Sequence, residues 1–142
     1  MKKTNYFKFL LIILVLTFIT GCSSLTTPSD KADLIITDIF QVPPEDIIYY
    51  TVENQGTATA SATTSFLYID GEYKDSDLVG SLNPGESRTE SFWTFTYNWP
   101  EDCTGASDTI VIQADVENEV VEDNESNNTY MEEIGCFLII VI

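Results

Sequence analysis

Short runs of alternating apolar and polar residues make up most of the chain after residue 31, and turn-forming residues separate them. No stretch in this part keeps the 3.6-residue apolar period of an amphipathic helix, whereas the two-residue period of a β-strand recurs. In 47–53, for example, Ile48, Tyr50 and Val52 fall on one face of an extended strand. The pattern therefore predicts an all-β chain.

The runs predict seven strands, at 32–41, 47–53, 61–70, 72–82, 87–96, 109–116 and 129–142. Between them, Asp70-Gly71 suits a tight hairpin, and Asn83-Pro84-Gly85-Glu86 suits a type II turn in which glycine takes the positive φ. Seven short strands in about 110 residues favour an antiparallel β-sandwich.

Three of these strands carry more specific expectations. Charged residues in 72–82 favour an edge strand. Trp93 and Phe95 lie in the middle of 87–96, so we expect both to fill the core. The apolar end of 129–142 predicts a last strand that is buried on both faces.

The first 21 residues differ in character from the rest. Three lysines precede an apolar run at 9–19, which is the layout of a secretory signal peptide and is shorter than the ~20 residues that a membrane-spanning helix needs. The run stops at Ile19-Thr20-Gly21-Cys22, which resembles the lipobox of prokaryotic lipoproteins. The resemblance implies cleavage before Cys22 and a lipid on its sulfur.

We therefore predict a signal peptide at 1–21, a lipidated Cys22 with a polar tether at 22–31, and one domain at 32–142. Two or more acyl chains give stable anchoring, so the domain is expected at the extracytoplasmic face of the cell membrane or at the cell surface. The alternatives are an uncleaved anchor, or a plain secretory signal with an incidental cysteine.

The composition narrows the possible functions. The chain has 23 Asp+Glu, 6 Lys+Arg and no His, which gives a formal net charge of −17. Such a field repels phosphates, so we expect no nucleic acid partner. Without histidine the usual general base is missing, and we expect no enzyme. The remaining catalytic possibility is a pair of carboxylates in a cleft, for which a single sandwich offers little room.

Two cysteines, Cys103 and Cys136, remain after the amino-terminal segment. An even pair outside the cytoplasm favours a disulfide, here across a spacing of 33 residues. Metal binding by the two thiols is the weaker alternative, because no histidine and no Cys-x-x-Cys pair is present.

Three segments, taken in order, resemble the CARDB family, the "cell adhesion related domain found in bacteria". They are YTVENQGTATASATTSFLYIDG at 50–71, VGSLNPGESRTESFWTFT at 79–96 and ADVENEVVEDNESNNTY at 114–130. The resemblance implies a seven-stranded immunoglobulin-like sandwich that serves as an extracellular adhesion or accessory module. The cysteine pair and the apolar tail at 137–142 depart from the expected pattern.

The motif residues also have purely structural explanations. Gly56 and Gly85 suit backbone arrangements that a Cβ would oppose. Asn54 and Asn128 can bond backbone groups at strand ends, and Asp115 can close an Asx-type turn with Asn118. We expect these roles first.

The acidic stretch after 116 offers a sharper alternative, a Ca²⁺ site. Oxygen ligands are abundant there, but no EF-hand spacing is present, and a solvated acidic loop is the commoner arrangement. The candidate ligands are Asp115, Glu117, Glu119, Glu122, Asp123 and Glu125, with Asn127 and Asn128 beside them. We expect no other cofactor.

Two further features are candidates for contact or modification. Asn124 and Asn127 begin N-x-S/T sequons, which are used only where a glycosylation pathway exists. Trp99, beside Pro100 in a predicted loop, is the best candidate for an exposed ligand contact.

These observations together predict a non-catalytic, lipid-anchored binding or adhesion module. Its partners are the membrane, through the lipid, and an unknown cell-surface protein or polysaccharide. The alternative is an accessory or inhibitor subunit that grips another envelope protein through its loops or its apolar last strand.

Overall fold

The computed structural model describes residues 30–42, 45–99 and 101–136. They form strands and turns, and no helix among them is long and apolar enough to cross a membrane. The strands are β1 (Leu34–Gln41), β2 (Ile48–Asn54), β3 (Thr63–Ile69), β4 (Glu72–Val79), β5 (Ser87–Ser91), β6 (Ser107–Gln113) and β7 (Thr129–Gly135). The predicted all-β, seven-stranded architecture is confirmed.

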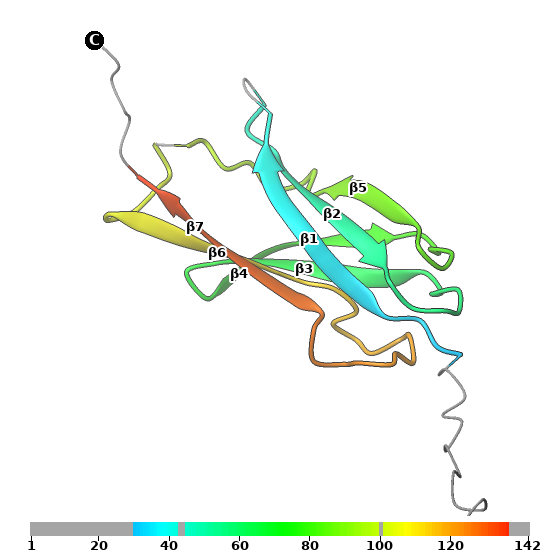
Figure 1. Ribbon diagram of the computed structural model, residues 1–142. Coiled ribbons are helices and arrows are strands. Elements are labelled where there is room, and N and C mark those ends of the chain that lie inside the picture. The colour runs from blue at the N-terminus through cyan, green and yellow to red at the C-terminus, as the bar shows by residue number, and fades with distance from the viewer. Residues whose placement is uncertain (1–29, 43–44, 100, 137–142) are drawn as a thin grey trace, which may run out of the picture.

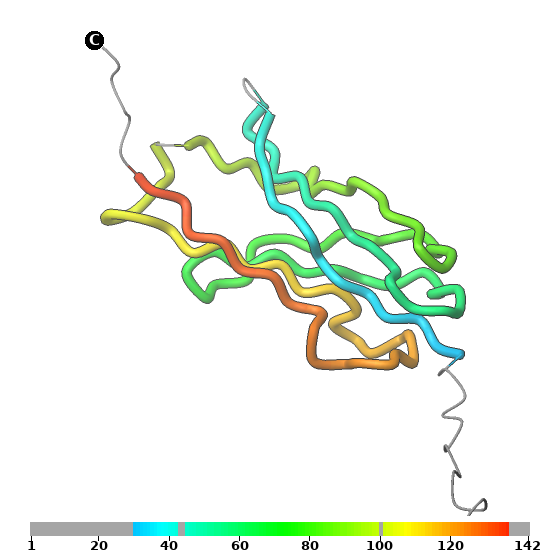
Figure 2. Tube along the Cα trace, in the orientation of Figure 1, coloured from blue at the N-terminus to red at the C-terminus, as the bar shows by residue number. Residues whose placement is uncertain are grey.

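The strands form two layers (Figure 1). One sheet has the order β1-β2-β5 and the other β4-β3-β6-β7, and every neighbouring pair is antiparallel. In Figure 2, the strands β1 and β2 of one layer run obliquely to the strands β3 and β4 of the other. The predicted edge position of β4 is also confirmed, and β7 forms the opposite edge.

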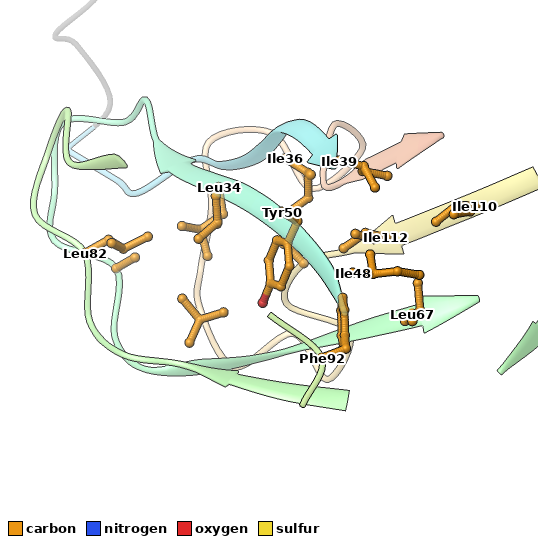
Figure 3. Close-up of a cluster of buried hydrophobic side chains, with 14 of the residues drawn as sticks. Leu34, Ile36, Ile39, Ile48, Tyr50, Leu67, Leu82, Phe92, Ile110 and Ile112 are labelled. Carbon is orange, nitrogen blue, oxygen red and sulfur yellow. The ribbon is translucent and has the colours of Figure 1, made fainter. Parts of the chain in front are cut away.

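The core lies between the sheets and follows the predicted alternation. Ile48, Tyr50 and Val52 of β2 are fully buried, and the ring of Tyr50 stacks on Phe92 with centroids 5.0 Å apart. Figure 3 shows isoleucines and leucines of both sheets around this pair. Burial of these side chains supplies the main drive for folding, at roughly 2 kcal/mol for each large one.

The two predicted turns take the expected backbone conformations. Asp70 and Gly71 between β3 and β4 have φ of 52° and 79°. Gly85 has φ of 73°, and the Glu86 N–H donates to the Asn83 carbonyl at 2.9 Å. These residues fit because glycine and aspartate tolerate positive φ better than larger or β-branched residues.

The strand predicted at 87–96 is shorter than expected. It ends at Ser91, and Trp93, which we expected in the core, is 69% exposed. The cause is Asp75 on β4, whose carboxylate accepts hydrogen bonds from the backbone N–H and hydroxyl of Thr94 and holds this segment out of the sheet. Phe95 is partly buried against the core, as expected.

The last strand also differs from the prediction. The described part of it, β7, alternates between half-buried and exposed positions instead of being buried on both faces. Two features explain this alternation. β7 lies at the edge of its sheet, so its inward side chains are only half covered, and its outward side chains have no layer above them. The apolar residues 137–142 lie outside the described residues.

Candidate functional site

A cleft of about 520 Å³ opens beside the β3–β4 hairpin, at the end of the sandwich where residues 92–106 connect β5 to β6. Its apolar lining comes from Ile69, Phe95 and Tyr97, and its polar lining includes two threonines. The charged residues in the lining are Asp70, Glu72, Asp102, Asp108 and Lys74. The size falls within the range of sites that take small ligands or single side chains of a partner.

The buried side chain of Asp108 holds the floor of this cleft together. Its carboxylate accepts hydrogen bonds from the Tyr97 hydroxyl at 3.0 Å and from the Thr104 backbone N–H at 2.8 Å. Burial and the bond to Asp108 raise the pKa of Tyr97, so this hydroxyl stays protonated and donates. The connection from β5 to β6 is thus fixed to the start of β6.

The remaining acids of the cleft also have structural partners. Asp70 accepts the backbone N–H of Thr109 at 2.9 Å, and Asp102 accepts that of Asn98 at 2.8 Å. Lys74 pairs with Glu72 at 2.9 Å and lowers its pKa below the ordinary value. A general acid needs the opposite shift, so Glu72 is a poor candidate for that role.

The cysteine pair closes the same end of the molecule. Cys103 and Cys136 form a disulfide with Cα atoms 5.4 Å apart, as predicted. Nearby, the indole N–H of Trp99 donates to the Gly135 carbonyl at 3.0 Å. Trp99 is 38% exposed, so it remains accessible at this end of the sandwich while it ties the loop to the end of β7.

Three of the predicted calcium ligands gather in the loop between β6 and β7. Asp115, Glu122 and Glu125 each bring one carboxylate oxygen within 4.8 Å of the others. Asp115 accepts the backbone N–H groups of Glu119 and Val120, at 2.9 and 3.1 Å. The loop therefore already uses this carboxylate to bond its own backbone. The turn predicted between Asp115 and Asn118 is closed by backbone groups instead, because the Asn118 N–H donates to the Asp115 carbonyl at 3.0 Å.

Glu122 is as deeply buried as Asp115, at 2% exposure, whereas Glu125 is exposed. It accepts hydrogen bonds from the Leu34 backbone N–H and from the Asn128 side-chain amide, and Glu125 accepts the Glu122 backbone N–H at 2.9 Å. Desolvation, with repulsion from Asp115 and Glu125, raises the pKa of Glu122 to about 7.

The other predicted residues of this stretch lie apart from that cluster. Glu117, Glu119 and Asp123 are exposed and do not join it. Asn124 is exposed, and its carbonyl oxygen accepts the hydroxyl of Ser126 at 2.6 Å. Asn127 is half-buried and donates to Asp33 at 2.8 Å, so attachment of a glycan there would disrupt this bond. Cys22 lies outside the described residues.

Asn54 confirms the structural role expected of the motif residues. Its buried side chain donates to the carbonyls of Ala58 and Leu82 at 2.8 and 3.0 Å, and it accepts the N–H groups of Asp33 and Gly56, both at 3.1 Å. These four bonds fix the turn after β2 to both neighbouring segments.

The sequence did not single out the cleft. In the sequence, Asp70 indicates only a hairpin, and Thr104 and Asp108 belong to no recognisable motif. Their one sequence signal is a concentration of short polar side chains at 102–108, next to a cysteine, which is also typical of an ordinary loop.

Comparison with known families decides the classification. The CARDB family model matches residues 31–132. This chain belongs to the CARDB family. CARDB is a family of cell-adhesion-related domains, which are typically extracellular or at the cell surface. No curated protein matches the chain.

Solved structures agree with the CARDB assignment. A domain of a putative cell surface protein from Methanosarcina acetivorans is 31% identical with a TM-score of 0.64, and the alignment covers 75% of this chain and 93% of that one. The CARDB domain of a Pyrococcus furiosus protein, in complex with di-metal ions, is 26% identical with a TM-score of 0.57, over 75% and 94% of the two chains.

The described residues of this CARDB chain include two groups of three side chains that could supply metal ligands. One of the two groups that could supply ligands contains Cys103, Asp108 and Cys136, but its sulfurs are joined in the disulfide. The other is the Asp115, Glu122 and Glu125 cluster, whose carboxylates accept backbone N–H groups of the loop and of β1. Both groups therefore already have structural partners in this chain.

Proposed function

We propose that the protein is a non-catalytic, lipid-anchored adhesion-type module that acts on the outer side of the cell membrane. The observation that carries this proposal is the order of the segments: a lipobox-like sequence ends at Cys22, and the match to a cell-adhesion-related family begins at residue 31. Only a short polar segment separates the two, so the domain would sit close to the membrane surface.

The cleft beside the β3–β4 hairpin is where we expect a surface ligand to bind. Its lining combines apolar side chains with hydroxyl and carboxylate groups, which suits a single residue of a polysaccharide or a side chain of another surface protein. Its carboxylates hold backbone and hydroxyl groups in place, which supports recognition rather than catalysis.

Metabolic labelling with a radioactive fatty acid tests the anchor. The wild-type chain should incorporate label and stay with membranes, whereas Cys22→Ser should lose the label and should not remain membrane-bound after its signal segment is removed. Ser24→Ala, two residues away, is the matched control and should behave as wild type. A cleaved Cys22→Ser chain that remained on membranes would overturn the proposal.

The accessory-subunit alternative has one supporting observation, the edge position of β7 in its sheet. An edge strand offers unpaired backbone groups to which a partner strand can be added. Deletion of 137–142 from the full chain, followed by cross-linking in intact envelopes, tests it. Loss of a cross-linked partner band supports the alternative, and an unchanged pattern removes it.

A further inference from the structure

The outward face of the four-stranded sheet is almost free of charge, although the chain has 23 acidic residues. This surface, here called the outer face, is formed by the side chains of β3, β4, β6 and β7 that alternate with the buried ones. They are Thr64, Phe66, Tyr68, Tyr73, Ser76, Leu78, Ser107, Thr109, Val111, Gln113, Thr129, Met131 and Glu133. Glu133 is the one charged residue among them.

The strand register aligns apolar side chains in a row across the whole sheet. Tyr73 pairs with Tyr68, Tyr68 with Val111, and Val111 with Met131, so all four strands contribute. The ring of Phe66 adjoins the row, with its centroid 5.2 Å from that of Tyr73. Tyr73 and Met131, at the two ends of the row, are 54% and 64% exposed, so the row is open to solvent.

Charge restricts what can cover this row. A partner that brought charged side chains against this row would bury them without an opposite charge, because the row itself carries none. A surface that is itself apolar and uncharged is the complementary one. Protein–protein contact surfaces are poor in acids and lysines and rich in tyrosine, phenylalanine and methionine, as the outer face is.

The orientation of the rings argues against a sugar chain on this face. The planes of Phe66, Tyr68 and Tyr73 are inclined to one another by 53° to 75°. Inclined rings present edges rather than one flat platform, so successive sugar units cannot stack on them. Rings in such edge-to-face arrangements pack well against other side chains.

We propose that the outer face is a self-association surface, on which the same face of a second copy of this chain packs. A two-fold dimer needs only a self-complementary patch, and here neutral side chains meet neutral ones while all the acids except Glu133 stay outside the contact. With a two-fold axis parallel to the strands, Tyr73 lies against Met131 of the second copy, a favourable pairing of ring and sulfur.

The area of the outer face predicts a weak dimer. Strands of seven residues at ~3.3 Å, set ~4.8 Å apart in a four-stranded sheet, cover roughly 440 Å² in projection. Stable interfaces bury about 800 Å² per partner, so this contact belongs to the weak class. The contact should form in solution at high protein concentration; anchoring in a membrane would raise its population further, and only this last step rests on the proposed function.

Sedimentation equilibrium of the full chain tests the proposal, in detergent with more micelles than protein molecules. We expect a dimer that becomes tighter between 0.1 and 1 M NaCl, because salt screens the repulsion between two chains of −17 charge each. Association through charge pairs would weaken over the same range. Lipidation is measured separately, so the proposed function and this inference can fail independently.

Two variants locate the contact. Met131→Glu and Tyr73→Glu place carboxylates on the outer face and should each weaken dimerisation at least tenfold. Val121→Glu is the matched control, because Val121 is also a highly exposed apolar residue, at 71%, but lies in the loop after β6. Unchanged melting temperatures show that the variants fold. A chain that stays monomeric at 1 M salt, or three variants that dimerise equally, would overturn the proposal.

Discussion

The carboxylate of Glu122, in the loop between β6 and β7, accepts the backbone N–H of Leu34, the first residue of β1, across 88 positions of the sequence. A parallel bridge between Ala32 and Glu122 lies directly beside this bond. A buried acid therefore holds the start of the domain against its acidic loop. Since the acid titrates near neutral pH, this contact makes stability depend on pH.

We predict that the free energy of unfolding falls by about 2 kcal/mol between pH 5 and pH 8. The pKa of Glu122 is about 7 in the folded protein and 4.5 in the unfolded chain, so the folded state binds more protons between these values. The stability that protonation confers is fully present below pH 4.5 and is lost as the pH rises through 7. Urea unfolding at a series of pH values measures it.

Glu122→Gln provides the control for this pH dependence. The amide keeps an oxygen for the Leu34 N–H, and the unpartnered carbonyl oxygen of Asn128 can turn to accept its N–H group. The variant should be at least as stable as wild type at pH 8 and should lose most of the slope above pH 5. Burial also raises the pKa of Asp77 and Glu90, so some slope at lower pH remains. A slope above pH 5 equal to that of wild type would contradict the assignment.

Asn54→Ala should lower the free energy of unfolding by about 2 kcal/mol, because the half-buried backbone N–H groups of Asp33 and Gly56 lose their acceptor and the buried carbonyl of Leu82 loses a donor. Asn98→Ala removes an exposed asparagine and should cost less than about 0.5 kcal/mol. Chemical denaturation of both variants measures the difference. Equal stabilities would show that the turn after β2 does not depend on this side chain.

Reduction of the Cys103–Cys136 disulfide should cost up to about 4 kcal/mol, the loop-closure contribution for a separation of 33 residues. It should also loosen the Trp99 indole from the Gly135 carbonyl. Fluorescence reports this change once the exposed Trp93 is replaced by Phe, leaving Trp99 as the one tryptophan. If dithiothreitol changes neither the emission nor the unfolding midpoint, the disulfide does not hold this loop.

Gly56→Ala should destabilise the protein by about 2 kcal/mol or more, because the added Cβ would lie 2.5 Å from backbone atoms of Lys31, Ala32 and Asp33. Gly135→Ala is the matched control, since no neighbouring atom lies within 4 Å of its Cβ position. Thermal unfolding of both variants distinguishes a steric clash with the 31–33 backbone from the general effect of replacing a glycine on stability. Similar melting temperatures would show that the 31–33 segment can move away.

Calcium at millimolar concentration should leave the melting temperature unchanged, because the clustered carboxylates of Asp115, Glu122 and Glu125 already accept hydrogen bonds from the backbone. The calcium alternative predicts a rise at pH 8 that disappears at pH 5.5, where Glu122 is protonated, and that is absent in Glu122→Gln. Calorimetry with CaCl₂, with MgCl₂ as the control, distinguishes the two.

Much of the fold could be predicted because the local signals agree with the tertiary structure. The alternation in β2 and β3 follows from the two-residue period of an extended backbone. The glycines at 71 and 85 follow from the positive φ that their turns require. The early end of β5 could not be predicted in this way. It depends on Asp75, which lies far from Thr94 in the sequence and captures its backbone N–H.

The candidate sites were less predictable, for a related reason. Composition at 114–128 showed that acids are abundant, but only the chain path decides that Asp115, Glu122 and Glu125 converge while Glu117 turns to solvent. The cleft is formed by the β3–β4 hairpin together with residues 95–108. No local pattern records that these two segments meet.

The two ends of the sandwich differ, and the first residues of the domain lie at the end that carries the acidic loop. Residues 30–32 lie beside the acidic loop, whereas the cleft and the disulfide lie at the far end (Figure 1). A domain held by its first residues would therefore turn its most acidic loop towards the lipid headgroups. With the anchor proposed at Cys22, this arrangement would place the cleft at the end of the domain that faces away from the membrane.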